Sequence, residues 1–266
     1  MEKVHILAIA NQKGGVGKTT TAVNLGVYLA AAGERVLLID VDPQANATSS
    51  LGFDKHAIRR SIYDTLVDGR PLADVIVPSG RDGLDIAPAS VQLAGAEVEL
   101  VPLMAREHRL AKALEKLGDR YGIVLIDCPP SLGLLTLNAL TAADGVLVPL
   151  QAEYLALEGL IQLRQTVERV VSYLNPKLEI FGILLTMFDN RTNLSAQVQD
   201  EVRRHFPSDL LTTVIARSVR LSEAPSHGLT IREYDPVSRG AAAYAQLAAE
   251  VRLRLKNGHR DQVAVR

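Results

Sequence analysis

The sequence predicts an α/β protein in which a doubly wound, mostly parallel sheet carries helices on both faces. Short runs of β-branched residues and leucine alternate with helical stretches, which is typical of βαβ units. These runs are nearly all apolar, as strands covered on both faces are. Two of them end in aspartate, at the strand end where doubly wound sheets bind ligands. Six central strands are expected, at 4–10, 35–40, 122–127, 145–150, 178–187 and 210–216.

Helical spacing of apolar residues fills the intervals between these strands. Five helices are expected, at 19–33, 107–120, 155–174, 192–206 and 239–256. The first should end at Gly33, because glycine is the preferred residue after a helix C-terminus. No repeat, low-complexity segment or linker divides the chain. A single domain is therefore expected over residues 1–257, followed by a polar, disordered tail at 258–266.

Composition excludes several classes of protein. The 266 residues contain one cysteine, Cys128, so neither a disulfide framework nor a cysteine-rich metal cluster is expected. No stretch approaches the roughly 20 apolar residues of a membrane span, and the chain is expected to be cytoplasmic. A net charge of −1 gives no global attraction to nucleic acid, so any contact with DNA must come from a local cluster. Aromatic residues, at 4%, are too scarce for binding by base stacking.

The segment "NQKGGVGKTTTAVN", residues 11–24, predicts a phosphate-binding loop. A strand, a glycine-rich turn and a helix N-terminus gather backbone N–H groups around an anion. ATP with Mg²⁺ is the ligand this pattern favours, with Lys18 on the β/γ-phosphates and the Thr19 hydroxyl on the metal. A glycine-rich turn beside an ordinary surface lysine is the weaker alternative, because strand, spacing and helix all agree. The nucleotide-binding residues are Lys13, Gly14, Gly15, Val16, Gly17, Lys18, Thr19 and Thr20.

The loop departs from the usual glycine pattern at its start. Counting back from Gly17 and Lys18, the first glycine should stand at position 12, where this chain has Gln12. Lys13 lies beside that gap. On the residues alone, Lys13 could equally be a solvated surface lysine.

Aspartates at two strand ends should complete the site. Asp40 ends the run at 35–40 and Asp42 comes two residues later, while Asp127 ends the run at 122–127. A carboxylate there can hold Mg²⁺ directly or through water, although each could alone be a turn or helix cap. The combination with the loop favours the nucleotide site. Cys128 is read as a small buried residue.

The motifs together resemble the ParA/Soj partition ATPases, in the deviant Walker A group of P-loop NTPases that also includes MinD and the nitrogenase iron protein. The resemblance extends in consistent order from about residue 4 to residue 255. It is carried by "KGGVGKTT" (13–20), "DVDPQANAT" (40–48), "LIDCPPSLGLLTLNAL" (125–140), "VPLQAEYLALEGL" (148–160), "GILLTMFDNRT" (182–192) and "VRLSEAPSHG" (219–228). Close relatives often have Pro and Asn on either side of a basic residue, at a strand end near the adenine base of the nucleotide. This chain has Ala216 and Ser218 at those positions, on either side of Arg217.

The resemblance implies roles for five residues. Lys13 is the family's signature lysine, which crosses a dimer interface to the phosphates bound by the partner subunit. Lys18 binds phosphate in its own subunit, and Thr19 ligates Mg²⁺. Asp42 positions the hydrolytic water, and Asp127 reaches Mg²⁺ through water. Lys13, Lys18 and Asp42 are thus the expected catalytic residues, and weak basal ATP hydrolysis is expected.

Three branches of the group differ in what they attach to. An iron-protein-like reductase needs cysteine pairs, which one cysteine cannot supply. A MinD-like membrane-positioning ATPase remains the alternative, but the C-terminal stretch lacks Phe and Trp for an amphipathic anchor, so no stable membrane association is expected.

The third branch comprises the partition ATPases of chromosomes or plasmids, which bind DNA. We favour this branch for the protein. An excess of arginines near the C-terminal end could bind duplex phosphates without sequence preference. These arginines could also be solvated and paired with nearby acids. The resemblance implies an ATP-dependent homodimer on nucleoid DNA, released when a ParB-like partner stimulates hydrolysis. With no N-terminal extension, operator binding is not expected. The candidate DNA-binding residues are Arg203, Arg204, Arg217, Arg220 and Arg232.

Overall fold

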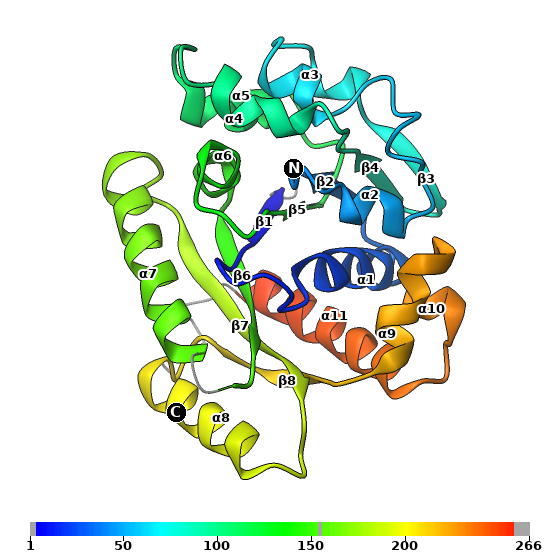
Figure 1. The fold of residues 1–266 in the computed structure, drawn as a ribbon, viewed down its shortest axis with the longest axis vertical. Coiled ribbons are helices and arrows are strands. Elements are labelled where there is room, and N and C mark those ends of the chain that lie inside the picture. Colours follow the sequence, from blue (N-terminus) through cyan, green and yellow to red (C-terminus); the bar gives the residue numbers. More distant parts are fainter. Residues whose placement is uncertain (1–3, 154–155, 258–266) are drawn as a thin grey trace.

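The computed structural model describes residues 4–153 and 156–257, which include an eight-stranded sheet in the order β3-β4-β2-β5-β1-β6-β7-β8 (Figure 1). The antiparallel pair β3–β4 forms one edge, and every other neighbouring pair is parallel. The strands are β1 His5–Ile9, β2 Val36–Asp40, β3 Val77–Arg81, β4 Leu84–Ala87, β5 Ile123–Asp127, β6 Gly145–Gln151, β7 Glu179–Phe188 and β8 Leu210–Ala216. The predicted fold class is confirmed.

Helices cover both faces of the sheet and bury two separate cores (Figure 1). One core packs α1 (Lys18–Ala31), α10 (Ile231–Tyr234) and α11 (Arg239–Asn257) on one face. The other face carries a longer series of helices. That series is α3 Ile62–Leu66, α4 Leu93–Glu99, α5 Arg109–Leu117, α6 Leu134–Ala142, α7 Ala156–Tyr173 and α8 Asn193–His205. The remaining short helices are α2 Asn46–Ser50, η1 Leu72–Asp74, η2 Arg106–His108, α9 Val219–Glu223 and η3 Ala224–His227.

The predicted elements agree with the observed ones to within a few residues, with one error of position. The strand predicted at 210–216 is present as β8, but it lies at the edge of the sheet instead of the centre. Its residues alternate between buried and more exposed, because only one neighbour and one covering face shield them. Gly33 follows the end of α1 with φ +91°, as a residue after a helix C-terminus should. The tail predicted at 258–266 lies outside the described residues.

The register of the central strands brings the candidate carboxylates together. Asp127, the last residue of β5, pairs with Ile9 of β1 on one side and with Asp40 of β2 on the other. The loop that follows β1 therefore leaves the sheet beside both aspartate-bearing strand ends. None of the helices in the described part of the chain combines the length and apolar character that crossing a bilayer would need.

Candidate functional site

The loop between β1 and α1 has the backbone shape of an anion cradle. Gly15 and Gly17 adopt φ of +75° and +87°, which residues with a Cβ rarely do. A Cβ at Gly14 or Gly15 would meet no atom within 4 Å, so open space lies beside the loop at both positions. No side chain caps the start of α1 at Gly17. The first N–H groups of the helix are therefore left for an external acceptor.

Two bonds from distant strands hold the loop in place. The Asn11 side chain donates to the Pro149 carbonyl on β6 over 2.8 Å. The Thr186 hydroxyl on β7 donates to the Val16 carbonyl, also over 2.8 Å. Since both side chains are buried, the loop is fixed to the sheet from two sides before any ligand arrives.

Lys18 lies inside the cradle with 6% of its surface exposed. Its ammonium donates to the Lys13 carbonyl over 2.9 Å. Burial lowers the pKa of Lys18, while the nearby Asp127, Cys128 and Asp42 act in the opposite direction. The ammonium has three N–H donors and uses one of them on this carbonyl, so two remain available for phosphate oxygens.

Asp127 is the most unusual group in the site. It is fully buried, and within residues 4–153 and 156–257 neither carboxylate oxygen has a hydrogen-bond partner. Burial raises its pKa well above the ordinary value, and Asp40 raises it further. Thr19 and Lys18 lie close enough to favour the charged form, without a well-formed hydrogen bond to either oxygen. A carboxylate held in this way suits a cation, or the water shell of a cation.

Asp40, its neighbour across the register, is a structural carboxylate. The Thr48 hydroxyl and backbone N–H donate to it over 2.7 and 2.9 Å, and the Asp42 N–H over 3.2 Å. Burial nevertheless raises the pKa of Asp40 to about 6. Because Asp40 already has these partners, it serves to shape the turn that carries Asp42.

Asp42 differs from Asp40 in having capacity left for a ligand. One of its carboxylate oxygens accepts the Gln44 N–H over 2.9 Å, and the side chain is 6% exposed. Cys128, beside Asp127, is fully buried, and burial raises the pKa of its thiol. The cysteine is a packed core residue, as its sequence context predicted.

The side chain of Lys13 has a partner at the surface of the molecule. Its side chain forms an ion pair with Glu153 and is 45% exposed, while its N–H donates to the Asn11 side chain over 3.0 Å. The ammonium of Lys13 is thus held at the surface near the end of β6. Sequence reasoning did not single out Glu153, since nothing in its local pattern marks it as a partner for residue 13.

A further buried contact ties the first turns of α1 to α10. The Asn24 side chain donates to the Thr20 carbonyl and accepts the Ile231 N–H, both over 2.8 Å. The Thr21 hydroxyl lies 3.3 Å from the Tyr244 hydroxyl of α11. The helix that begins at the cradle is therefore bonded directly to the two C-terminal helices on its face.

The structure separates the five candidate DNA-binding arginines into two places. Arg203 and Arg204 lie in the last turn of α8, where they pair with Asp200 and Glu201 of the same helix. Arg217 lies past the other end of β8. Seven residues of strand separate these positions, a span of roughly 20 Å. The arginines do not form one cluster in a single chain.

Arg217, Arg220 and Arg232 follow β8 on the side of α9 and α10, and all three are exposed. Arg220 lies 3.1 Å from Glu223 and 3.6 Å from Asp235. In the part of the chain that the structure describes, no carboxylate lies within 4.0 Å of Arg217 or Arg232. Neither side chain is thus held in an ion pair, although the charge of Arg217 acts on Asp189 and helps to lower its pKa.

No group of three or more His, Cys, Asp or Glu side chains in the described ranges is arranged to enclose a metal ion. Mg²⁺ in nucleotide sites needs no such cage, because it takes one or two protein ligands together with phosphate oxygens and water. Thr19, at the start of α1, and the unpartnered Asp127 carboxylate fit that smaller requirement.

Several known proteins are similar to this chain in sequence and in fold. A family model described as an AAA domain matches residues 4–180. The sporulation initiation inhibitor protein Soj of Bacillus subtilis is 58% identical over 246 residues, covering 92% of this chain and 97% of its own. The chromosome partitioning protein ParA of Caulobacter vibrioides is 54% identical over 250 residues, covering 93% and 94%.

A solved structure of high similarity is that of a cobyrinic acid a,c-diamide synthase from Mycobacterium smegmatis with a bound ATP analogue and magnesium. It is 39% identical, has a TM-score of 0.84, and the match covers 96% of this chain and 97% of the other. Sequence identity is markedly higher to the Soj and ParA proteins, over nearly their full lengths. The protein therefore belongs to the ParA/Soj family of chromosome-partitioning ATPases.

Proposed function

We propose that the protein runs a DNA-partitioning cycle in which two ATP-bound subunits form a sandwich dimer on DNA and separate after hydrolysis. The observation that carries the proposal is the pairing of an open glycine cradle with a buried carboxylate that has no partner of its own within the described chain. Such a pair is costly in the free protein, because a buried charged oxygen without a hydrogen bond is destabilising. It is accounted for if the cradle receives phosphates and the carboxylate faces their magnesium.

Each residue of the cradle has a proposed part. Gly14 to Gly17 and Thr20 bind phosphate through backbone or hydroxyl groups, and Lys18 contacts the β/γ oxygens. Thr19 would hold Mg²⁺, and Asp127 would bind its water shell. When bound, Mg²⁺ neutralises charge on the β- and γ-phosphates. Asp42 orients the attacking water with the carboxylate oxygen that its bond to Gln44 leaves free.

Lys13 acts on the nucleotide of the partner subunit. Its side chain is 45% exposed, and its ammonium is held by Glu153 in the single chain. Across a dimer interface it would add positive charge where the transition state gains negative charge. Hydrolysis by a single subunit is consequently weak, and a ParB-like partner accelerates it by stabilising the complete arrangement.

Duplex DNA is bound without sequence preference by the exposed arginines that follow β8. Arg217 and Arg232 have no paired carboxylate in the described residues, and Arg220 shares its partner Glu223 with Tyr234. Arg203 and Arg204 would contribute only if DNA also passes the far end of β8. Residues 1–257 are proposed to act as one domain, placed on the nucleoid when ATP is bound.

The decisive experiment for the cycle compares Lys13→Ala with Lys177→Ala, an exposed lysine on another face. Lys13→Ala should abolish ATP hydrolysis and reduce dimer formation by analytical ultracentrifugation, and Lys177→Ala should do neither. Normal turnover in Lys13→Ala would refute the role in trans. Asp42→Ala should trap an ATP-bound dimer on DNA, whereas failure to bind ATP would remove its role in orienting water.

A second experiment decides between DNA and membrane attachment. The wild type, with ATP, ADP or no nucleotide, is offered duplex DNA and anionic liposomes in parallel. ATP-dependent and salt-sensitive retention on DNA alone is expected, with Arg217→Glu weakening it while dimerisation survives. Sedimentation with liposomes and indifference to DNA would support the MinD-like alternative instead.

A further inference from the structure

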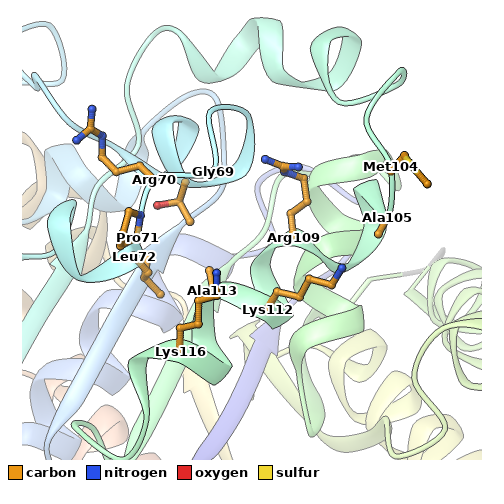
Figure 2. A pocket seen from close by; sticks show the side chains of 11 residues that line it. Gly69, Arg70, Pro71, Leu72, Met104, Ala105, Arg109, Lys112, Ala113 and Lys116 are labelled. Atoms are coloured by element: carbon orange, nitrogen blue, oxygen red, sulfur yellow. The ribbon is translucent and has the colours of Figure 1, made fainter.

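A second basic pocket lies between the turn that follows α3 and the helix α5, separate from the cradle. It has a volume of about 200 Å³. Figure 2 shows Gly69 to Leu72 on one side and Arg109, Lys112 and Lys116 extending from α5 on the other. The side chains that line it include four cations and no acid, namely Arg70, Arg109, Lys112 and Lys116.

The charge of this pocket is largely uncompensated. In residues 4–153 and 156–257 no carboxylate lies within 4.0 Å of Arg109, Lys112 or Lys116. Arg70 has only a long contact, with its Nε 3.9 Å from Asp64. Four cations around one concavity raise the local concentration of anions.

Arg109 is held in position by the backbone of the opposite wall. Its guanidinium donates to the Leu66 carbonyl and, over 3.1 Å, to the Val67 carbonyl. Gly69 has φ +74°, and a Cβ there would lie 3.4 Å from an Arg109 nitrogen. The guanidinium is thus fixed before any ligand binds, with further donors left over.

A buried hydroxyl gives an independent indication of a ligand. Thr65 lines the pocket, is 3% exposed, and its Oγ1 has no hydrogen-bond partner in the described part of the chain. A helical threonine commonly donates to the carbonyl four residues earlier, but the Thr65 hydroxyl makes no such bond to Ser61. A buried hydroxyl without a partner, on a residue that lines the same pocket as the four cations, is a donor that a bound acceptor can satisfy.

We propose that this pocket binds the phosphate group of a small phosphate ester. A tetrahedral oxyanion accepts from several guanidinium, ammonium and hydroxyl donors at once. The pocket is smaller than the roughly 300–1,000 Å³ typical of drug-sized ligands, which favours a compact ester over a nucleotide. Leu72, Ala113 and Met104 provide apolar walls for the carbon part of the molecule. A duplex backbone is a poorer candidate, because the Thr65 hydroxyl lies below the surface.

The test uses the full chain saturated with a non-hydrolysable ATP analogue and Mg²⁺, so that all the phosphate positions of the cradle are filled. Inorganic phosphate and glycerol 3-phosphate are titrated while amide signals of Gly69 and Ala113 are followed by NMR, with glycerol as the uncharged control. Saturable shifts with both anions and none with glycerol are expected. Absence of saturable binding by either anion refutes the proposal.

Three variants locate the binding. The double variant Lys112→Ala/Lys116→Ala should bind about tenfold more weakly, since each lost charge-assisted bond carries part of the affinity. Thr65→Val should weaken binding without lowering the unfolding midpoint, because it removes a hydroxyl that has no partner in the free protein. Lys256→Ala, on α11, should bind as the wild type does. Equal affinities in all variants would place the anion elsewhere and overturn the proposal.

Two further arms separate possible sources of the phosphate. Vesicles of phosphatidylcholine with phosphatidic acid test a lipid headgroup, and a duplex oligonucleotide tests a nucleic-acid backbone. Binding of free glycerol 3-phosphate without vesicle sedimentation supports the proposal. The proposal is overturned if the protein does not bind the free ester but binds vesicles or duplex DNA, and if the double variant weakens that binding.

Discussion

Asp127→Asn should make the nucleotide-free protein more stable while weakening its response to magnesium nucleotide. The Asp127 carboxylate is fully buried and neither oxygen has a partner in the described residues. An unsatisfied buried group costs about 1–3 kcal/mol, and more when charged, so removal of the charge should raise the free energy of unfolding by about 1–3 kcal/mol. For a chain of this size each kcal/mol corresponds to about 2–4 °C in midpoint.

The gain in stability should depend on pH in a definite direction. Burial raises the pKa of Asp127 above its ordinary value of 3.8. Well below pH 3.8 the carboxyl is protonated in both the folded and the unfolded chain, so the penalty is absent. As the pH rises, the unfolded chain ionises more readily and the folded wild type loses stability. The difference between variant and wild type should therefore be smallest in acid and largest near neutral pH.

Urea unfolding in EDTA, followed by circular dichroism from about pH 4 to 8, measures this difference. A parallel melt with ADP and Mg²⁺ should show a smaller ligand-induced shift for Asp127→Asn than for the wild type. Asp119→Asn, at an exposed position, is the control and should change neither quantity. If Asp127→Asn is less stable than the wild type near neutral pH, then the Asp127 carboxylate is not an unsatisfied group kept for a cation.

Two more predictions concern the residues around this carboxylate. Thr48→Val removes the hydroxyl that donates to Asp40 over 2.7 Å, so it should raise the pKa of Asp40 above about 6 and lower the free energy of unfolding by about 1–3 kcal/mol. The variant should lose most stability at a pH above the pKa of Asp40, where the carboxylate is charged. Urea titrations that show the same loss of unfolding free energy at low and at high pH would contradict this. Gly17→Ala forces an L side chain to φ +87° and should cost about 1–2 kcal/mol and weaken ADP binding in calorimetry, whereas Gly14→Ala, without a positive φ, should spare the fold.

The sequence was sufficient for the strands that are apolar throughout. Helices cover both faces of these strands, so nearly all of their residues are apolar and their burial can be predicted from the sequence alone. The strands are β1, β2, β5, β6 and β7. β3 and β4 were missed because they form a short edge hairpin with Pro78 and Gly80 in its first strand. The Asp82–Gly83 turn between them was a usable signal. α6 was missed for another reason, since its apolar and polar residues are spread around the helix and show no helical period.

The candidate site divides in the same way between local and distant information. Residues 13–20 reveal a phosphate loop because its chemistry lies in one continuous segment. The anchor from Thr186 to Val16 joins residues 170 positions apart, and the ion pair of Lys13 with Glu153 likewise depends on which strands become neighbours. The split of the arginines between the two ends of β8 was equally hidden, because sequence proximity of Arg204 and Arg217 does not measure distance along a strand.

The Asn24 side chain gives the molecule a mechanical connection that is shorter than its chain path. One amide group holds both the Thr20 carbonyl at the cradle and the Ile231 N–H beside Arg232. These two bonds connect the start of α1 with the start of α10 through a single side chain. A displacement of the phosphate loop therefore has a direct contact through which it can reach the arginine-bearing surface.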